Sequence, residues 1–136
     1  MKVEVRYQSK SGNTKKVADA IANAAGVQAL DVENPLAEPA DVLFLGGAIY
    51  AGGLNGKLKK FIKGLQEGAV GKIVLFSTAM GPKHIGPKVE ALLKGKNIPL
   101  EEEELHIRSN ELLPEDRQQY DAAMEKAAQF AKKMTE

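Results

Sequence analysis

The sequence predicts an α/β protein built on a parallel five-stranded sheet with helices on both faces. Short apolar segments alternate with segments whose apolar residues recur at helical spacing along the 136 residues. The most apolar segments, 41–45 and 73–76, lack a polar face, which is typical of strands that helices cover on both sides. No repeat or long linker interrupts the alternation, so we expect a single domain over residues 1–136.

The chain is expected to open with a strand, a helix and a second strand. Residues 3–7 read as a short strand that leads into a polar turn. The helix that follows carries Val17 and Ile21 on one apolar stripe and ends at Gly26, since glycine is the residue best suited to a helix C-terminus. Residues 27–32 then predict a second, weaker strand.

The middle of the chain is expected to add one strand and one helix. Residues 34–40 contain two prolines and are too short and broken for a helix. The apolar strand 41–45 runs into the pair Gly46–Gly47. The next helix is expected to end at Gly68, and its apolar positions are Leu58, Phe61, Ile62 and Leu65.

The last third repeats the scheme. The apolar strand 73–76 is followed by a helix that is expected to end at Gly95. Leu105 and Ile107 mark the fifth strand, and the acidic run 101–104 before it is expected to be a solvated edge or, alternatively, a docking site for a basic partner. Pro114 is expected to open the final helix, whose apolar positions are Tyr120, Met124, Ala127, Phe130 and Ala131.

Composition excludes several classes of function. The chain is 43% hydrophobic and 27% charged with a formal net charge of +1, so we expect no attraction to nucleic acid or to a membrane. It contains no cysteine, which excludes thiol catalysis and thiolate metal sites, and redox chemistry would need a bound cofactor. We see neither a targeting segment nor a spanning segment and expect a cytoplasmic protein.

The turn between the first strand and the first helix has the composition of a phosphate-binding loop. Ligands of such sheets bind at the carboxyl ends of the strands, where the strand order reverses. The turn joins hydroxyl groups, a glycine that tolerates positive φ and the unpaired N–H groups of a helix start. An ordinary helix cap is the alternative. The P-loop and dinucleotide motifs are both missing. The candidate residues are Ser9, Lys10, Ser11, Gly12, Asn13 and Thr14.

This turn resembles the phosphate-binding loop of flavodoxins, and the resemblance extends over essentially the whole chain. It implies a flavodoxin-like, three-layer, doubly wound fold with the strand order 2-1-3-4-5. It also implies FMN as the cofactor and an electron-transfer role in which the flavin cycles through semiquinone and hydroquinone. The implied partners are FMN, a reductase as electron donor and an oxidised acceptor protein.

The loop after the third strand resembles the flavodoxin loop that covers one face of the flavin ring. Tyr50 is the residue expected to stack on the ring. In flavodoxins a peptide of this loop turns over during reduction, and the matching peptide here is Ala51–Gly52, where glycine makes the turned form accessible. The alternative is a plain turn with a surface tyrosine. The residues assigned to the cofactor are Ala48, Ile49, Tyr50, Ala51 and Gly52.

The segment after the fourth strand matches the second ring-binding loop of flavodoxins, whose backbone would contact the pyrimidine edge of the flavin. The aromatic residue of better-known flavodoxins is absent here, so we expect weaker FMN binding and a more open flavin face. Met80 either packs on the ring or serves as a partly buried filler. The residues assigned are Ser77, Thr78, Ala79, Met80 and Gly81.

Lysines gather in the segments on or next to the expected cofactor side, and their charge predicts a less negative second reduction potential than in acidic flavodoxins. The alternative is that they are solvated helix faces. They are Lys10, Lys15, Lys16, Lys57, Lys59, Lys60 and Lys83. No catalytic role is assigned to His84 or His106, and no metal site is expected.

Two other functions remain open. One is a small FMN-dependent reductase of quinones or related acceptors, including protoporphyrinogen-oxidase-like activity. The other is a module that kept the fold but lost tight flavin binding. A receiver domain is excluded because the third strand lacks an acceptor aspartate, and a serine hydrolase is excluded because no Gly-x-Ser-x-Gly motif occurs.

Overall fold

A computed structural model describes residues 1–50 and 53–136 and contains one five-stranded sheet. All neighbouring strands are parallel, in the order β2-β1-β3-β4-β5, which confirms the predicted order. The strands are β1 (Val3–Tyr7), β2 (Ala29–Asp31), β3 (Ala40–Gly47), β4 (Val70–Ala79) and β5 (Leu105–Arg108).

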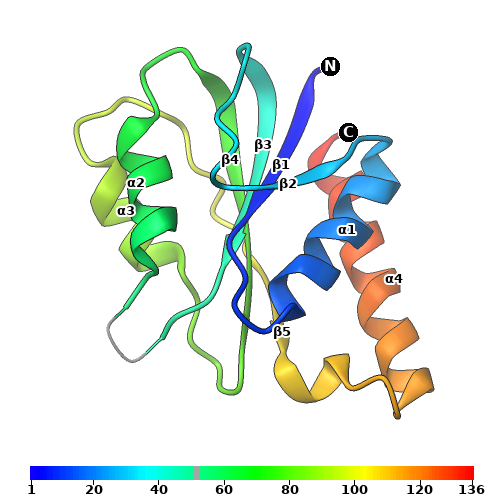
Figure 1. Cartoon of the computed structure of the whole chain (residues 1–136). Helices are drawn as coiled ribbons and strands as arrows, with labels where there is room; N and C mark the ends of the chain where they lie inside the picture. Colours follow the sequence, from blue (N-terminus) through cyan, green and yellow to red (C-terminus); the bar gives the residue numbers. More distant parts are fainter. Residues whose placement is uncertain (51–52) are drawn as a thin grey trace.

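Helices cover both faces of the sheet, as a doubly wound α/β protein requires. In Figure 1 the first and last α-helices lie side by side on one face, and the two middle helices lie on the other. This confirms the three-layer architecture. The helices are α1 (Asn13–Ala25), α2 (Gly56–Gly64), α3 (Gly86–Leu93) and α4 (Arg117–Met134), with a short 3₁₀ helix, η1 (Ser109–Leu112), after β5.

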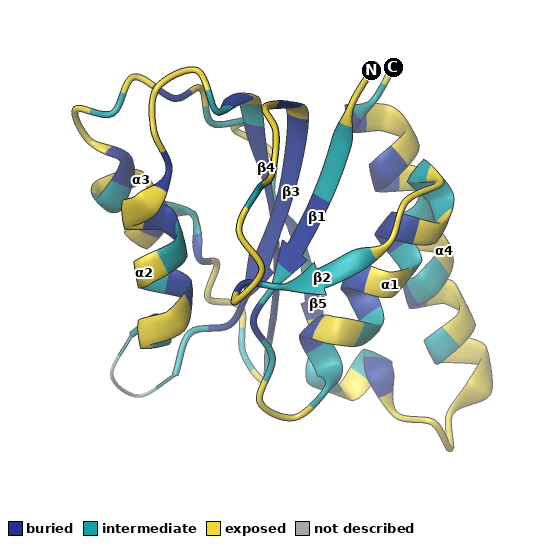
Figure 2. Cartoon of the chain, turned by 45° about the horizontal axis from the view of Figure 1, so that its top comes forward, coloured by how far each residue is buried: buried dark blue, intermediate teal, exposed yellow. Residues whose placement is uncertain are grey.

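The two faces of the sheet form separate apolar cores because side chains alternate along each strand. In β3, Phe44 faces α1 and α4, and its ring meets Phe130 edge-on at 6.3 Å. Its neighbours Leu43 and Leu45 face α2 and α3. Figure 2 shows the central strands buried and the outward helix faces exposed. The continuous apolar runs that predicted two-sided burial are therefore explained.

Gly46 is required by close packing between β3 and β4. A Cβ atom built on Gly46 would lie 2.0 Å from Cε2 of Phe76, whose ring is fully buried. Gly46 pairs with Phe76 in the parallel register, so the glycine provides the space that the aromatic ring fills. The Gly46–Gly47 pair therefore belongs to the end of β3 as well as to the loop after it.

Several predicted boundaries were wrong, each for a physical reason. The second strand is shorter than 27–32 because Gly26, at φ 75°, and Val27 close the end of α1: both N–H groups donate back into its last turn. Helix α2 ends at Gly64, well before Gly68. Helix α4 begins at Arg117 rather than at Pro114, because Asp116 caps it by accepting from the N–H of Gln119.

The carboxyl ends of the strands meet at one edge of the sheet, at the bottom of Figure 1. The connections that leave β1, β3 and β4 all lie at this edge, which is where the ligand crevice of a doubly wound sheet is found. Among the residues that the structure describes, no helix has the length and apolar character needed to cross a membrane.

Candidate functional site

The turn between β1 and α1 presents an uncapped helix start. Gly12 is the N-cap residue at φ 94°, and no described side chain caps the helix there, so the alternative of an ordinary side-chain cap is wrong. Ser9 Oγ accepts the N–H of Gly12 at 3.0 Å, which holds the turn closed. A Cβ on Gly12 would meet no described atom within 4 Å. The first-turn N–H groups thus have no side-chain cap among the described residues, and an anion can bind there.

A buried pair of hydroxyl groups joins this turn to the end of β4. Thr14 Oγ1 lies 2.7 Å from Thr78 Oγ1, and both residues are buried. Either hydroxyl can be the donor, so one of the two retains a proton for another acceptor. The structure therefore brings together two residues that the sequence assigned to separate cofactor loops.

The described residues on the two sides of positions 51–52, after β3, lie close together and next to the first loop. Tyr50 and Gly53 exchange two backbone hydrogen bonds of 2.9 Å, and Gly53 adopts φ 99°. The ammonium group of Lys10 lies 4.8 Å from the centre of the Tyr50 ring, so the turn after β1 contacts the segment after β3. Ala48 is buried and Ile49 is half-buried. The predicted residues Ala51 and Gly52 lie outside the described part of the chain.

The expected loop 77–81 is partly strand. Ser77, Thr78 and Ala79 belong to β4 because β5 pairs with them, from Ser77–His106 to Ala79–Arg108. Pairing with β3 ends earlier, at Gly47–Ser77. The next two residues of β4 therefore extend past β3 at the candidate crevice. Met80 is 90% exposed, so the interpretation of a partly buried filler is wrong.

Gln8 is a residue of this edge that the sequence analysis did not single out. Its backbone N–H donates to Gly46 at 3.0 Å, which places it between the ends of β1 and β3. Its side chain is buried, yet Oε1 has no hydrogen-bond partner within residues 1–50 and 53–136. A buried acceptor without a donor destabilises the folded state, so we expect a ligand group or a water molecule to donate a hydrogen bond to this atom. No sequence motif marks it.

The lysines of this side are partly paired. Lys57 forms an ion pair with Glu33, and Lys15 lies 2.9 Å from Asp19. Hydrogen bonding and charge attraction from Lys57 lower the pKa of Glu33, and Glu33 in turn raises the pKa of Lys57. Each carboxylate offsets the charge of one lysine, so the net positive charge available to a ligand is smaller than the number of lysines indicates. Both pairs are exposed and screened by solvent.

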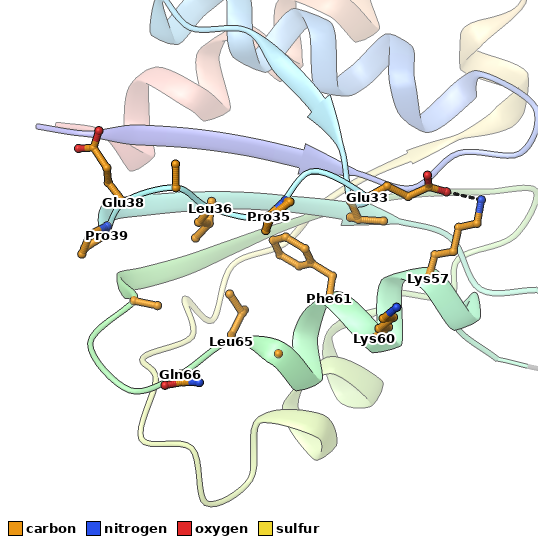
Figure 3. A pocket seen from close by; sticks show the side chains of 14 residues that line it. Glu33, Pro35, Leu36, Glu38, Pro39, Lys57, Lys60, Phe61, Leu65 and Gln66 are labelled. Atoms are coloured by element: carbon orange, nitrogen blue, oxygen red, sulfur yellow. Dashed lines mark ion pairs between the residues drawn. The ribbon is translucent and has the colours of Figure 1, made fainter.

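A hollow of about 840 Å³ lies elsewhere, between α2 and the irregular segment that joins β2 to β3. Figure 3 shows Phe61 of α2 pointing toward Pro35 and Leu36 of that segment, with the Glu33–Lys57 ion pair at one end. None of the described cofactor candidates is among its lining residues. It is lined mainly by apolar side chains and lacks the converging donors of the crevice.

The acidic run 101–104 is not simply a solvated edge. Glu104 accepts the N–H groups of Ile85 and Gly86 at 2.9 and 2.8 Å, which caps the start of α3. It also accepts a hydrogen bond from the hydroxyl of Ser77. The sequence contains one signal that Glu104 and His106 lie close together. They are two residues apart at the start of a strand and so project to the same face.

The fold and the edge geometry define a doubly wound α/β protein with a ligand crevice at the point where the strand order reverses. The Flavodoxin domain family matches residues 5–98, and the chain therefore belongs to the flavodoxin family. No curated protein sequence matches the chain.

Solved structures share the fold along nearly the whole chain. Oxidised flavodoxin 1 from Bacillus cereus has a TM-score of 0.71 and 23% identity, with 96% of this chain and 95% of that chain covered. Oxidised flavodoxin 2 from the same organism gives 0.67 and 23%, with 98% and 99% covered. The apo form of an NADH:FMN oxidoreductase gives 0.59 and 17%, with 94% and 89% covered.

Proposed function

We propose that this chain binds FMN at the carboxyl edge of the sheet and carries electrons between protein partners. The observation that carries the proposal is the uncapped N-terminus of α1, which follows a turn whose Lys10 contacts the ring of Tyr50. Family membership and the similarity to structures named as flavodoxins support the choice of a flavin. Residues 1–136 act as one domain in this proposal.

The turn between β1 and α1 is proposed to hold the phosphate group. The N–H groups of the first turn of α1 and the hydroxyls of Ser11 and Thr14 supply donors, and the helix dipole favours the negative charge. Thr78 can donate to Thr14, which leaves the Thr14 proton for a phosphate oxygen. Lys10 and Asn13 line the same turn, and Ser9 keeps its shape by bonding Gly12.

The ring system is proposed to lie between the turn after β3 and the end of β4. Tyr50 supplies an aromatic face, and Met80 supplies an exposed thioether that a planar ring would cover. Backbone groups of Thr78 and Ala79 lie where β4 extends beyond β3, and Gly81 follows shortly after the end of that strand. Ile49, Ala51 and Gly52 are further proposed contacts. The unpartnered Gln8 Oε1 fits a hydroxyl or N–H group of a bound flavin.

A bound FMN supplies reversible one- and two-electron chemistry, and the chain's own residues bind, orient and shield it. The exposed position of Met80 puts the proposed ring site near the protein surface, which gives a short path for electrons to a docked partner protein. The alternative is a small FMN-dependent reductase. An NADH:FMN oxidoreductase is among the structures similar to this chain, but that similarity concerns the fold alone.

The test compares FMN with riboflavin, which lacks the phosphate. Titration of flavin fluorescence is expected to give saturable quenching by both ligands, with tighter binding of FMN. Ser11→Ala should weaken FMN binding and leave riboflavin binding unchanged, because Ser11 is placed at the phosphate alone. Thr135→Ala is the matched control: this hydroxyl donates to Ala131 near the end of α4 and should change neither affinity. Equal affinities for the two ligands would contradict the phosphate site.

A second measurement separates the carrier from the enzyme. The FMN-loaded protein is mixed with NADH or NADPH and a quinone, and oxidation of the nicotinamide is followed by absorbance. A carrier gives negligible turnover alone and rapid reduction once a flavodoxin reductase is added. Sustained turnover without a reductase would favour the reductase instead.

A further inference from the structure

The only two histidines of the chain lie against one another beside Glu104. The rings of His84, before α3, and His106, in β5, are stacked with their centres 4.6 Å apart and their planes at 27°. One ring nitrogen of each histidine and one oxygen of Glu104 lie within 4.8 Å of one another. Two imidazoles and one carboxylate form a frequent ligand set for zinc and related metals.

Main-chain carbonyl groups fix which nitrogen of each ring is free. His106 Nε2 lies 2.8 Å from the Gly81 carbonyl, and His84 Nδ1 lies 3.0 Å from the Pro82 carbonyl. A carbonyl oxygen only accepts, so each of these nitrogens carries a proton and donates. His106 Nδ1 and His84 Nε2 are therefore the nitrogens available to a metal ion. Such outer-shell bonds are the usual way in which metal-binding histidines are oriented.

Glu104 is held in place and still has room for a cation. Its Oε2 accepts from Ser77 and from the N–H of Ile85, whereas its Oε1 accepts only from the N–H of Gly86 among the described groups. A carboxylate offers about four lone-pair positions, so one remains on Oε1. The carboxylate is thus positioned by β4 and by the start of α3.

The hydroxyl of Ser77 lies between Glu104 and His106 and links these two candidate ligands. It contacts both Glu104 and His106 Nδ1, at 2.7 Å for the latter, but it has a single proton to donate. A cation bound to His106 Nδ1 would take the place of its contact with Ser77 and leave the Ser77 proton for Glu104.

We propose that His84, Glu104 and His106 bind a divalent transition-metal ion of the zinc class. Zinc bonds nitrogen at about 2.0–2.1 Å, so the ligand atoms must approach somewhat more closely than they do here. His84 is exposed, so its side chain has room to approach the other two. A hollow beside α3 is lined by His84 and Glu104 together with Glu90, Glu101 and Glu102, whose negative charge attracts a cation. The bound ion would tie the start of α3 to β5.

The test uses untagged, chelator-treated protein and follows zinc binding by calorimetry and cobalt binding by visible absorption. We expect saturable uptake of one ion per chain and a raised melting temperature with zinc. His84→Ala should weaken binding by about tenfold or more, since it removes a ligand. This exposed residue can be replaced without unfolding the chain, which the melting temperature in chelator will check. Glu90→Gln, in the same hollow but outside the cluster, should bind within a few-fold of the unchanged protein.

Three results would overturn the proposal. The first is absence of saturable uptake at micromolar zinc or cobalt. The second is unchanged affinity in His84→Ala. The third is an equal loss in Glu90→Gln, which would indicate diffuse attraction to acidic side chains rather than a site. Because the assay uses protein without flavin, its outcome is independent of FMN binding.

Discussion

The hydroxyl of Thr14, in the first turn of α1, lies 2.7 Å from the hydroxyl of Thr78, near the end of β4, and both are buried. This contact connects the turn that is proposed to hold phosphate with the strand end that is proposed to hold the flavin ring. A pair of hydroxyls shares one hydrogen bond and keeps one proton free. The pair therefore makes a structural contact and also retains a donor for a ligand.

Thr14→Val is expected to lower both stability and FMN affinity. The change leaves the buried Thr78 hydroxyl without its partner, at a cost of about 1–3 kcal/mol in the free energy of unfolding. Urea unfolding measures this cost, and a fluorescence titration measures the affinity. The double variant Thr14→Val/Thr78→Val replaces both hydroxyls by methyl groups and should be more stable than Thr14→Val alone, while its FMN affinity stays low. Equal stability of the single variant and the unchanged protein would contradict the contact.

Gly46→Ala is expected to destabilise the protein by about 3 kcal/mol or more, because the new methyl group would overlap the buried ring of Phe76. Gly64→Ala is the control. Gly64 ends α2, and a Cβ there meets no described atom within 4 Å, so alanine should raise stability by about 0.5 kcal/mol. Urea unfolding of both variants checks the difference. A mild effect at Gly46 would contradict the tight packing of β3 on β4.

Met80→Ala is expected to weaken FMN binding several-fold without changing stability. The side chain is 90% exposed, so it contributes little to folding, and it gains apolar contact only when a ring covers it. Val27→Ala, at the opposite end of the sheet, provides the control for a lost exposed apolar side chain. Flavin titration and thermal unfolding of both variants give the comparison. If Met80→Ala bound FMN normally, the ring would not lie against this residue.

Lys57→Gln is expected to raise the pKa of Glu33 toward its ordinary value. The ion pair lowers that pKa in the folded protein, so its contribution to stability is present above the pKa of an unfolded glutamate and is lost as the pH falls through the lowered folded value. Both groups are exposed, so the effect on stability is small and decreases with salt. An NMR pH titration of the Glu33 carboxyl carbon measures the shift. An unchanged midpoint in Lys57→Gln would contradict the pairing.

The architecture was predictable because its signals are local. The apolar runs at 41–45 and 73–76 carry no polar face, and only strands buried on both sides need that pattern. The extension of β4 to Ala79 was not predictable, because the partner that makes it a strand is β5, far along the chain. The start of α4 was misplaced because proline is a common first helical residue, yet Asp116 supplies the cap here.

The candidate crevice was predictable in position but not in its internal contacts. The residue types of the turn from Ser9 to Thr14 indicated an anion site, and the uncapped Gly12 is consistent with that prediction. The contact between Lys10 and Tyr50, and the buried Gln8 with its free acceptor, depend on how the ends of β1 and β3 meet. The cluster of His84, Glu104 and His106 likewise arises from the pairing of Ser77 with His106.

The central claim is that FMN binds at the carboxyl edge of the sheet, and a residue-resolved amide NMR titration tests it most directly. The claim predicts the largest shifts at Gly12, Asn13, Thr14, Tyr50 and Thr78, with Gly26, at the opposite end of α1, unmoved. Shifts centred on the hollow beside Phe61, or no shifts at saturating FMN, would contradict it.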